Sequence, residues 1–378
     1  VGSEMCIRDR NPFINHLGNG ITDPYIAKNT DCVPVKAELV WQDAPSLVTD
    51  IKYNSGTNGG TISFKVDKEN IRQGNALIAI KDSQNTILWS WHIWITDENI
   101  YHTIKVTNHQ NVSHDLMPIH LGWCEGEVIN YAARSCQVQF IAHGQTRLIT
   151  VNQMRSTTST QGNCTFYEWG RKDPLRPSSG YAYKNKTWYN AAGIASTANH
   201  AVESFPFGNE CIKNYIRKPD VMQKEIGGDN TYFNLWNADN NTNSNVYNDN
   251  PVTKTVYDPC PVGFAMPPSN TFTGFTTTGE NVTNTVAKYN GEWNSSLPGW
   301  NFYCGPNKTG GTIFFPMTGE RISSGGHLSA VGSLGHTWSA TSTHSNYAHN
   351  LTLYTNYWVW PLDRFSKSAG HGVRPCLE

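Results

Sequence analysis

Alternating apolar and polar side chains are the main pattern of the first 155 residues. In segment 61–66, three apolar side chains alternate with Thr, Ser and Lys, as in a strand with one solvated face. Segments 76–80 and 86–95 flank a polar stretch at 82–85, which predicts a hairpin. The second strand of this hairpin carries four large apolar residues on one face, which we expect to face the core: Trp89, Trp91, Ile93 and Ile95.

A second hairpin is predicted further along the same region. Segments 137–141 and 146–151 flank His143-Gly144, a sequence suited to a tight turn. With segment 37–41 included, the region holds roughly six short strands in about 120 residues and shows no helical period. This pattern predicts an immunoglobulin-like β-sandwich over residues 37–155.

The rest of the chain divides into three parts. Residues 11–36 precede the sandwich as an extension, and the polar stretch 156–163 follows it as a linker. Residues 164–378 show few clean strands, many Gly and aromatic interruptions, and an Asn-rich stretch at 234–250. One short amphipathic helix is predicted at Asn209–Arg217, with three residues on its apolar side: Ile212, Tyr215 and Ile216. The sequence therefore predicts a β-rich protein of two domains.

Composition narrows the classes of function. The 378 residues include 29 Lys and Arg against 30 Asp and Glu, so the net charge of -1 offers no basic field for nucleic acid, and we predict no nucleic-acid partner. The longest apolar run, Ile87–Ile95, is about half of the roughly 18 residues that a membrane span requires.

The first ten residues, Val1–Arg10, resemble the translated sequencing adapter that recurs at the ends of unrelated metagenomic reading frames. We exclude this segment from the fold prediction as an artefact. We expect the natural N-terminus to be missing together with any signal peptide or lipid anchor. Contact with a membrane is expected only through such a lost anchor.

The cysteines leave two interpretations open. Without Cys6, eight cysteines remain, and none has the C-x-x-C spacing of zinc or redox sites. They are either paired in disulfides, in an oxidising compartment, or buried as free thiols. Neither interpretation predicts a metal bound by cysteine.

Catalytic motifs are incomplete where the sequence approaches them. Lys308-Thr309 lacks the preceding glycine of a phosphate loop, because Asn307 stands there. Ser333 lacks the glycine of a nucleophile elbow two residues before it, because Val331 stands there. We therefore predict no catalytic residue and no cofactor.

Histidines gather toward the C-terminus without a local ligand spacing. No pair is spaced i, i+2 on a strand or i, i+4 on a helix. We therefore expect surface or loop histidines, and no metal site, at five positions: His327, His336, His344, His349 and His371.

Five blocks in residues 164–378 resemble, in order, those of the Fibrobacter succinogenes major paralogous domain. The most specific is Tyr257–Pro267, which contains a D-P-C-P-x-G signature. Cys164–Pro174 precedes it, and three shorter blocks follow near residues 315, 337 and 371. The residues that carry the resemblance are Trp169, Asp258, Pro259, Cys260, Pro261, Gly263, Gly319, Arg321, Trp338, Ser339, Val373 and Arg374.

The N-terminal region adds a second resemblance. Segments 74–80 and 87–94 are similar to the module that precedes this domain in Bacteroidales fimbrillin-family surface proteins. Together the resemblances imply a lipoprotein on the outer-membrane surface of a Gram-negative bacterium. They also imply that residues 164–378 form an α+β domain of the C-type-lectin-like or formylglycine-generating-enzyme-like kind.

The blocks also have a physical interpretation. The two prolines of Asp258-Pro259-Cys260-Pro261 fix a rigid corner before a strand. Gly319 and Gly372 would permit tight turns. For Arg321 and Arg374 we favour a scaffold role, in which buried guanidinium groups bind backbone carbonyls, over ligand binding. Three aromatic residues are expected to fill the core: Trp169, Phe264 and Trp338.

The sequence lacks the calcium-binding motifs of lectins, and it offers one candidate cysteine pair for an oxidase. The tripeptides typical of calcium-dependent lectins are absent, since Trp236–Asp239 contains an extra residue. Cys304 and Cys376 are the one late cysteine pair that an oxidase could use, and we expect them to form a disulfide or stay buried.

We therefore predict a non-enzymatic cell-surface protein that acts in adhesion or with fimbriae. Its expected partners are a glycan, a surface or host protein, or fimbrial subunits, with ligand-binding residues unassigned. The alternatives are an enzyme acting on carbohydrate or cysteine through the C-terminal domain, and a purely structural stalk.

Overall fold

The computed structural model describes residues 13–378 except residues 24, 70, 127, 160, 225–231, 241–245, 344–345 and 356. The excluded segment 1–10 and His344 lie outside the described residues. The described chain is β-rich and contains one α-helix, α1 (Asn209–Arg217). Its bounds and its buried side, Ile212, Tyr215 and Ile216, confirm the prediction from sequence. Short 3-10 turns occur at η1 (Ile26–Lys28), η2 (Thr57–Gly59), η3 (Thr273–Phe275), η4 (Val286–Lys288) and η5 (Pro306–Lys308).

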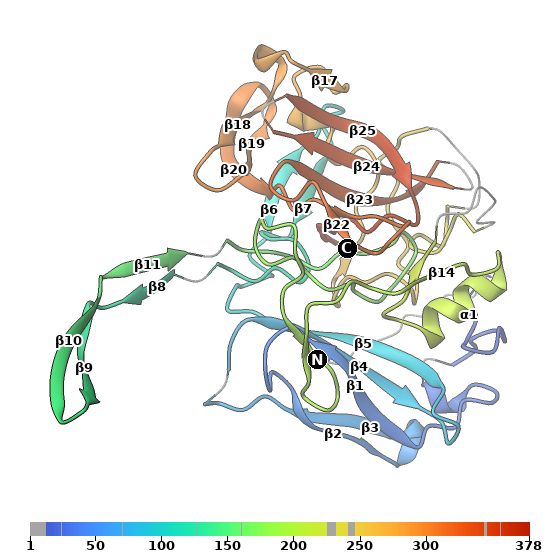
Figure 1. The fold of residues 1–378 in the computed structure, drawn as a ribbon. Coiled ribbons are helices and arrows are strands. Elements are labelled where there is room, and N and C mark those ends of the chain that lie inside the picture. Colours follow the sequence, from blue (N-terminus) through green and yellow to red (C-terminus); the bar gives the residue numbers. More distant parts are fainter. Residues whose placement is uncertain are drawn as a thin grey trace.

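The N-terminal part is built from a five-stranded sheet and a separate hairpin, at the bottom of Figure 1. The sheet order is β13 (Ala195–Ser196), β12 (Trp188–Tyr189), β1 (Lys36–Gln42), β4 (Gly74–Lys81) and β5 (Ile87–Ile95). The hairpin is β2 (Thr49–Asn54) with β3 (Thr61–Lys65). Apolar side chains of both layers form one cluster, including Leu47, Val48, Ala76, Ile78, Ile51 and Ile62. This arrangement agrees with the predicted sandwich character.

Strand β5 contacts two different cores. Its pairing with β4 is regular from Trp89 to Ile95, so Trp89, Trp91, Ile93 and Ile95 share one face, as the alternation predicts. Trp89 and Trp91 nevertheless pack in the large central core, whereas Ile93 and Ile95 pack in the sandwich cluster. The same face of β5 therefore contacts the central core at one end of the strand and the sandwich cluster at the other.

The predicted sandwich range 37–155 does not keep all its strands in one module. Strands β6 (Ile104–Thr107) and β7 (Ser113–Leu116) belong to a sheet of order β16 (Phe264–Ala265), β26 (Cys376–Leu377), β7 and β6. In return, β12 from the C-terminal range pairs with β1 at Gln42 and Tyr189. Each predicted domain thus contributes strands to the other.

The second predicted hairpin is present but stands apart from the body. β9 (Arg134–Ala142) and β10 (Gln145–Gln153) pair throughout, and His143 and Gly144 both have positive φ at the turn. Below it, β8 (Val128–Tyr131) pairs with β11 (Ser156–Ser159), so the start of the predicted linker is a strand. Residues 128–159 form a projecting arm in Figure 1, rather than part of the sandwich.

The C-terminal range has longer strands than its sequence predicted. One sheet has the order β17 (Val282–Thr283), β25 (Trp358–Ser366), β24 (Tyr347–Tyr354) and β23 (Leu334–Ser342), and another is β18 (Gly291–Asn294), β19 (Gly299–Gly305) and β20 (Thr309–Pro316). β23 and β24 are buried along most of their length, so they lack the period-two signal. The remaining pairs are β14 (Val202–Glu203) with β15 (Met222–Gln223), and β21 (Glu320–Arg321) with β22 (Leu328–Ser329).

A central core joins the two predicted domains. Ile80 and Trp89 from the N-terminal sheet lie in the same apolar cluster as Trp169, Trp236 and Trp338. A second cluster lies inside the C-terminal sheets, around the stacked rings of Phe275 and Phe302. No helix among the described residues combines the length and the apolar character needed to cross a bilayer.

Candidate functional site

The Asp258-Pro259-Cys260-Pro261 block forms a closed corner before β16. Asp258 accepts hydrogen bonds from the backbone N–H of Cys260 at 2.7 Å and of Met266 at 2.9 Å. The Lys254 ammonium donates to three carbonyl oxygens of the same corner, those of Cys260, Pro261 and Phe264. Burial raises the pKa of the Asp258 carboxyl, and Lys254 opposes that shift. These contacts hold the corner, and they leave no carboxylate oxygen directed at an open cleft.

Arg321 and Arg374 are fully buried and bind carbonyl groups. Arg321 donates to the backbone oxygens of Arg176 and Gly326 and to the side-chain oxygen of Asn185. Arg374 donates to the carbonyls of Met117, Pro118 and Phe314, and contacts His120 Nδ1. Burial lowers the pKa of Arg374 to about 9. Both guanidinium groups tie distant loops together, as expected of scaffold residues.

Trp169 and Trp338 join two of the sequence blocks that carry the resemblance through hydrogen bonds from their indole N–H groups. Trp169 Nε1 donates to the carbonyl of Ser339 at 3.1 Å, and Trp338 Nε1 donates to that of Tyr167 at 2.8 Å. Both rings are fully buried in the central core, as is Val373. Gly263 and Gly319 have positive φ, and a Cβ on Gly319 would lie 2.4 Å from the Ser329 carbonyl oxygen. The residues that carry the resemblance thus form a framework.

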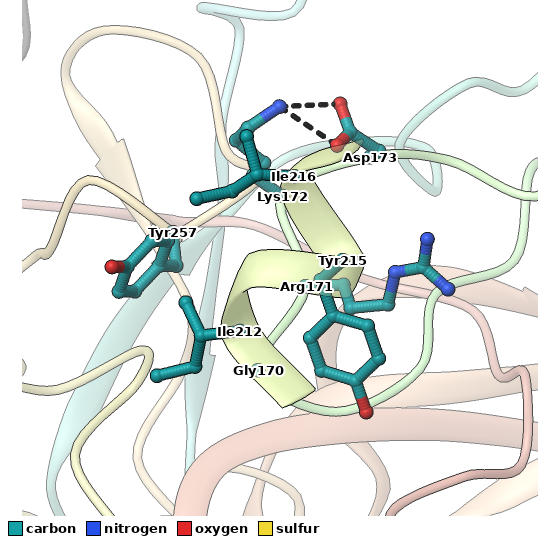
Figure 2. A pocket seen from close by; sticks show the side chains of 8 residues that line it. All are labelled: Gly170, Arg171, Lys172, Asp173, Ile212, Tyr215, Ile216 and Tyr257. Carbon is teal, nitrogen blue, oxygen red and sulfur yellow. Dashed lines mark hydrogen bonds and ion pairs between the residues drawn. The ribbon is translucent and has the colours of Figure 1, made fainter. Parts of the chain in front are cut away.

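A small cavity lies beside α1, and Figure 2 shows its lining. Its volume is about 10 Å³, room for a single water molecule, whereas substrate pockets span hundreds of Å³. The charged groups in its wall are paired, since Lys172 Nζ lies 2.7 Å from both carboxylate oxygens of Asp173. This cavity is therefore not a substrate site.

The described cysteines are free thiols. Seven of the eight are buried and Cys136 alone is exposed, so the disulfide interpretation does not hold for the described residues. Cys304 and Cys376, the pair considered for an oxidase, are both buried, and burial raises the pKa of Cys376 to about 12. Such a thiol is not activated as a nucleophile.

The expectation of surface histidines was wrong at three positions. His336, His349 and His371 are at most 2% exposed, because the strands and loops that carry them are packed inside the C-terminal region. Burial lowers the pKa of His336 to about 3 and that of His349 to about 4. His327 is exposed as predicted. Sequence reasoning missed this burial because β23 and β24 lack a period-two pattern.

The projecting arm carries several exposed apolar side chains on regular strands. The β9–β10 register places Cys136 opposite Val151, Val138 opposite Ile149, and Phe140 opposite Arg147. Paired residues of an antiparallel ladder share one face, so this face gathers the apolar side chains. We call it the apolar arm face: Cys136, Val138, Phe140, Ala142, Ile149 and Val151.

The opposite face of the arm is mostly polar. It presents Ser135, Gln137 and Gln139 from β9 and Thr146, Thr150 and Asn152 from β10, with Ile141 and Leu148 as its apolar members. Every residue of β9 and β10 is exposed, and no other described strand pairs with either edge. An amphipathic hairpin whose apolar face is in water indicates an interaction surface.

Charge on the arm is of one sign. Residues 134–155 contain Arg134, Arg147 and Arg155 and no Asp or Glu. The whole chain has 29 basic and 30 acidic residues, so acidic residues outnumber basic ones in the rest of the chain. The arm is therefore positively charged, whereas the remainder of the chain has 26 basic and 30 acidic residues.

In comparisons with protein-family models, with curated proteins and with solved structures, no match to this chain was found.

Proposed function

We propose that this chain is a non-enzymatic structural protein of the cell surface that assembles with further copies of itself through the projecting arm. In this proposal the apolar arm face of one copy packs against the body of the next. The observation that carries the proposal is the hairpin of two nine-residue strands with an exposed apolar face.

The size of the apolar arm face sets the expected affinity. Phe140, Ile149 and Val151 are between 51% and 54% exposed, and Val138 is 38% exposed. Covering the exposed half of such side chains contributes about 1 kcal/mol each, so the face supplies roughly 5 kcal/mol. Association costs about 4–15 kcal/mol in lost rigid-body freedom. Contact by this face alone would be weaker than millimolar, so we expect assembly only at high protein concentration.

Charge favours the body of a neighbouring copy over its arm. Two arms facing each other would bring together arginines without a carboxylate on either hairpin, whereas the rest of the chain has an excess of acidic residues. Contact between an arm and a different surface of the next copy is heterologous, and such contacts extend into open-ended assemblies unless the rotation closes a ring. A fimbria-associated protein requires this kind of growth.

The finer identity of the protein belongs to the same proposal. Its two parts would be an immunoglobulin-like module and a lectin-like major paralogous domain, as the sequence blocks suggest. An outer-surface lipoprotein with these parts would serve adhesion, with a glycan or a protein as a further ligand. The framework role of the block residues is compatible with this proposal and assigns them no ligand.

Light scattering and sedimentation of the full chain over a range of concentrations test the proposal. The expected result is a mass that keeps increasing beyond the dimer as concentration rises. The double variant Phe140→Ser with Ile149→Thr should remain monomeric. The matched control, Ile141→Ser with Leu148→Thr, removes similar apolar area from the opposite face and should assemble as the natural sequence does.

Three outcomes would contradict the proposal. A monomer at every concentration would remove self-assembly. A dimer that stops growing would indicate arm-to-arm contact and refute open-ended assembly. Equal loss of assembly in both double variants would show that the effect is not specific to the apolar arm face.

A further inference from the structure

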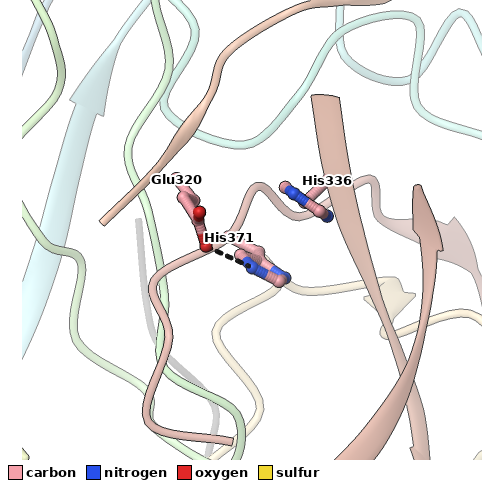
Figure 3. Close-up of side chains that lie close together, drawn as sticks. All are labelled: Glu320, His336 and His371. Atoms are coloured by element: carbon pink, nitrogen blue, oxygen red, sulfur yellow. Dashed lines mark ion pairs between the residues drawn. The ribbon is translucent and has the colours of Figure 1, made fainter. Parts of the chain in front are cut away.

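Three potential metal ligands from distant parts of the chain meet inside the C-terminal region. Glu320 lies on β21, His336 on β23, and His371 in the segment before β26 (Figure 3). Their ligand atoms all lie within 4.8 Å of one another, and Glu320 Oε2 is 3.7 Å from His371 Nε2. We call this group the Glu320–His336–His371 cluster.

The ring nitrogens of the cluster lack hydrogen-bond partners. His336 Nε2 and both nitrogens of His371 are buried without a hydrogen bond to any described residue. Each such buried group costs about 1–3 kcal/mol if nothing satisfies it. The ring of His371 is stacked between those of His336 and Trp338, with centroids 4.3 Å from each, so it cannot turn out to water. The cluster therefore presents three buried ring nitrogens whose hydrogen-bonding capacity no described residue uses.

The hydroxyl of Thr352 offers an acceptor to one ring nitrogen of His336. Its Nδ1 lies 3.0 Å from Thr352 Oγ1, and that hydroxyl donates its hydrogen to Asp363 Oδ2 at 2.6 Å. The Thr352 oxygen can then accept a hydrogen bond from Nδ1–H of His336, and in that tautomer the lone pair is on Nε2. Asn350 Nδ2 lies 3.2 Å from the same Nδ1, and it donates a hydrogen bond to Thr352 Oγ1 at 2.9 Å.

The chain of hydrogen bonds from His336 through Thr352 to Asp363 has the form of a metal-site second shell. Histidine ligands generally donate their second ring N–H to a carboxylate, a backbone carbonyl or a water, which orients the ring and sets its tautomer. A ring that donates from Nδ1 has a free lone pair on Nε2 for a metal.

We propose that Glu320, His336 and His371 bind one Zn²⁺ ion. Two imidazole nitrogens and one carboxylate oxygen are a donor set typical of zinc, whereas calcium and magnesium require more oxygen ligands. In a tetrahedral site with bonds of about 2.0–2.1 Å, ligand atoms lie about 3.3 Å apart. The 3.7 Å separation of Glu320 Oε2 and His371 Nε2 is close to this value. The Glu320 side chain is 13% exposed, so the carboxylate end of the cluster is the part nearest to solvent.

Zinc titration of the chelator-treated full chain tests the site. Calorimetry should give one ion per chain, and the unfolding temperature should rise with zinc concentration. Glu320→Gln and His336→Gln should each weaken binding by more than tenfold, and Thr352→Val by about tenfold through the second shell. Co²⁺ in place of Zn²⁺ should give the visible absorption of a four-coordinate site, and that absorption should be lost in Glu320→Gln.

His349→Gln is the matched control. His349 is also buried with both ring nitrogens unpartnered, but it lies outside the cluster, so this variant should bind zinc as the natural sequence does. Circular dichroism of metal-free Glu320→Gln should match that of the metal-free natural sequence, which excludes misfolding as the cause of lost binding. No binding by the natural sequence at millimolar zinc would overturn the proposal. Equal binding by Glu320→Gln and His336→Gln would do the same, because the ion would then lie elsewhere.

Discussion

Replacing Arg321 by lysine tests whether the blocks are a buried framework. The Arg321 guanidinium is fully buried and makes four hydrogen bonds to three acceptors, the carbonyls of Arg176 and Gly326 and the amide oxygen of Asn185. No carboxylate is among these partners. Lysine keeps the charge, but it replaces a planar group with several donors by one ammonium on a flexible stem.

The expected loss of stability follows from the acceptors left without a donor. If the ammonium reaches one of the three acceptors, two buried oxygens lose their partner. Each costs about 1–3 kcal/mol, so Arg321→Lys should lower the free energy of unfolding by about 4 kcal/mol. For 378 residues, an unfolding entropy of about 2.1 cal/mol/K per residue converts this loss into a decrease in the unfolding temperature of roughly 5 °C.

Thermal and urea unfolding of Arg321→Lys provide the measurement. Arg364→Lys is the control, because Arg364 is exposed on β25 and its replacement should change stability by less than about 0.5 kcal/mol. A loss below 1 kcal/mol for Arg321→Lys would refute the framework interpretation.

Gly319→Ala should lower the free energy of unfolding in urea by about 2–4 kcal/mol, because φ is 74° and the new Cβ would lie 2.4 Å from a carbonyl oxygen. Gly193→Ala is the control: φ is 71° but the space around it is open, so the loss should be about 1 kcal/mol. The free energy of unfolding should fall as pH drops from 6.5 to 5, because burial lowers the pKa of His92 and His336 to about 3 and that of His349 to about 4. The unfolded state then binds more protons than the folded state, which destabilises the folded state by about 2 kcal/mol per histidine at pH 5. A urea midpoint that stays constant over this range would contradict the prediction. In a Cys6→Ser background, maleimide should label one cysteine per folded chain, Cys136. Mass spectrometry counts the labels. Rapid labelling of more than one cysteine would show that the other described thiols are accessible.

Local patterns predicted the elements that are regular and half exposed. The helix Asn209–Arg217 and the hairpin around His143-Gly144 both have a clear periodicity, and both are present as predicted. The same patterns could not say where an element packs. The hairpin alternates as a sandwich strand would, yet both of its faces are in water. Period-two alternation reports that two faces differ, and it does not report which neighbour covers the apolar one.

The cluster of Glu320, His336 and His371 could not be found from sequence. Glu320 and His336 are 16 residues apart, and His336 and His371 are 35 residues apart, so no local spacing joins them. They meet because the Arg321 backbone pairs with that of Gly370 and the Thr337 backbone with that of Gly372. Such long-range pairings depend on the whole fold. The residues of the blocks were predictable as a set because glycine, proline and arginine in fixed positions have few structural uses.

The framework residues are sequence neighbours of the cluster residues, and they hold the backbone of the cluster in place. Glu320 stands between Gly319 and Arg321, and His371 stands next to Gly372. Reciprocal backbone hydrogen bonds of 2.9 Å join Arg321 to Gly370, and the Gly372 N–H donates to the His336 carbonyl at 3.1 Å. The backbone positions of all three ligand residues are therefore set by neighbouring groups rather than by the ligand side chains. A ligand substitution should remove metal binding while the frame persists, and a frame substitution such as Gly319→Ala should weaken both.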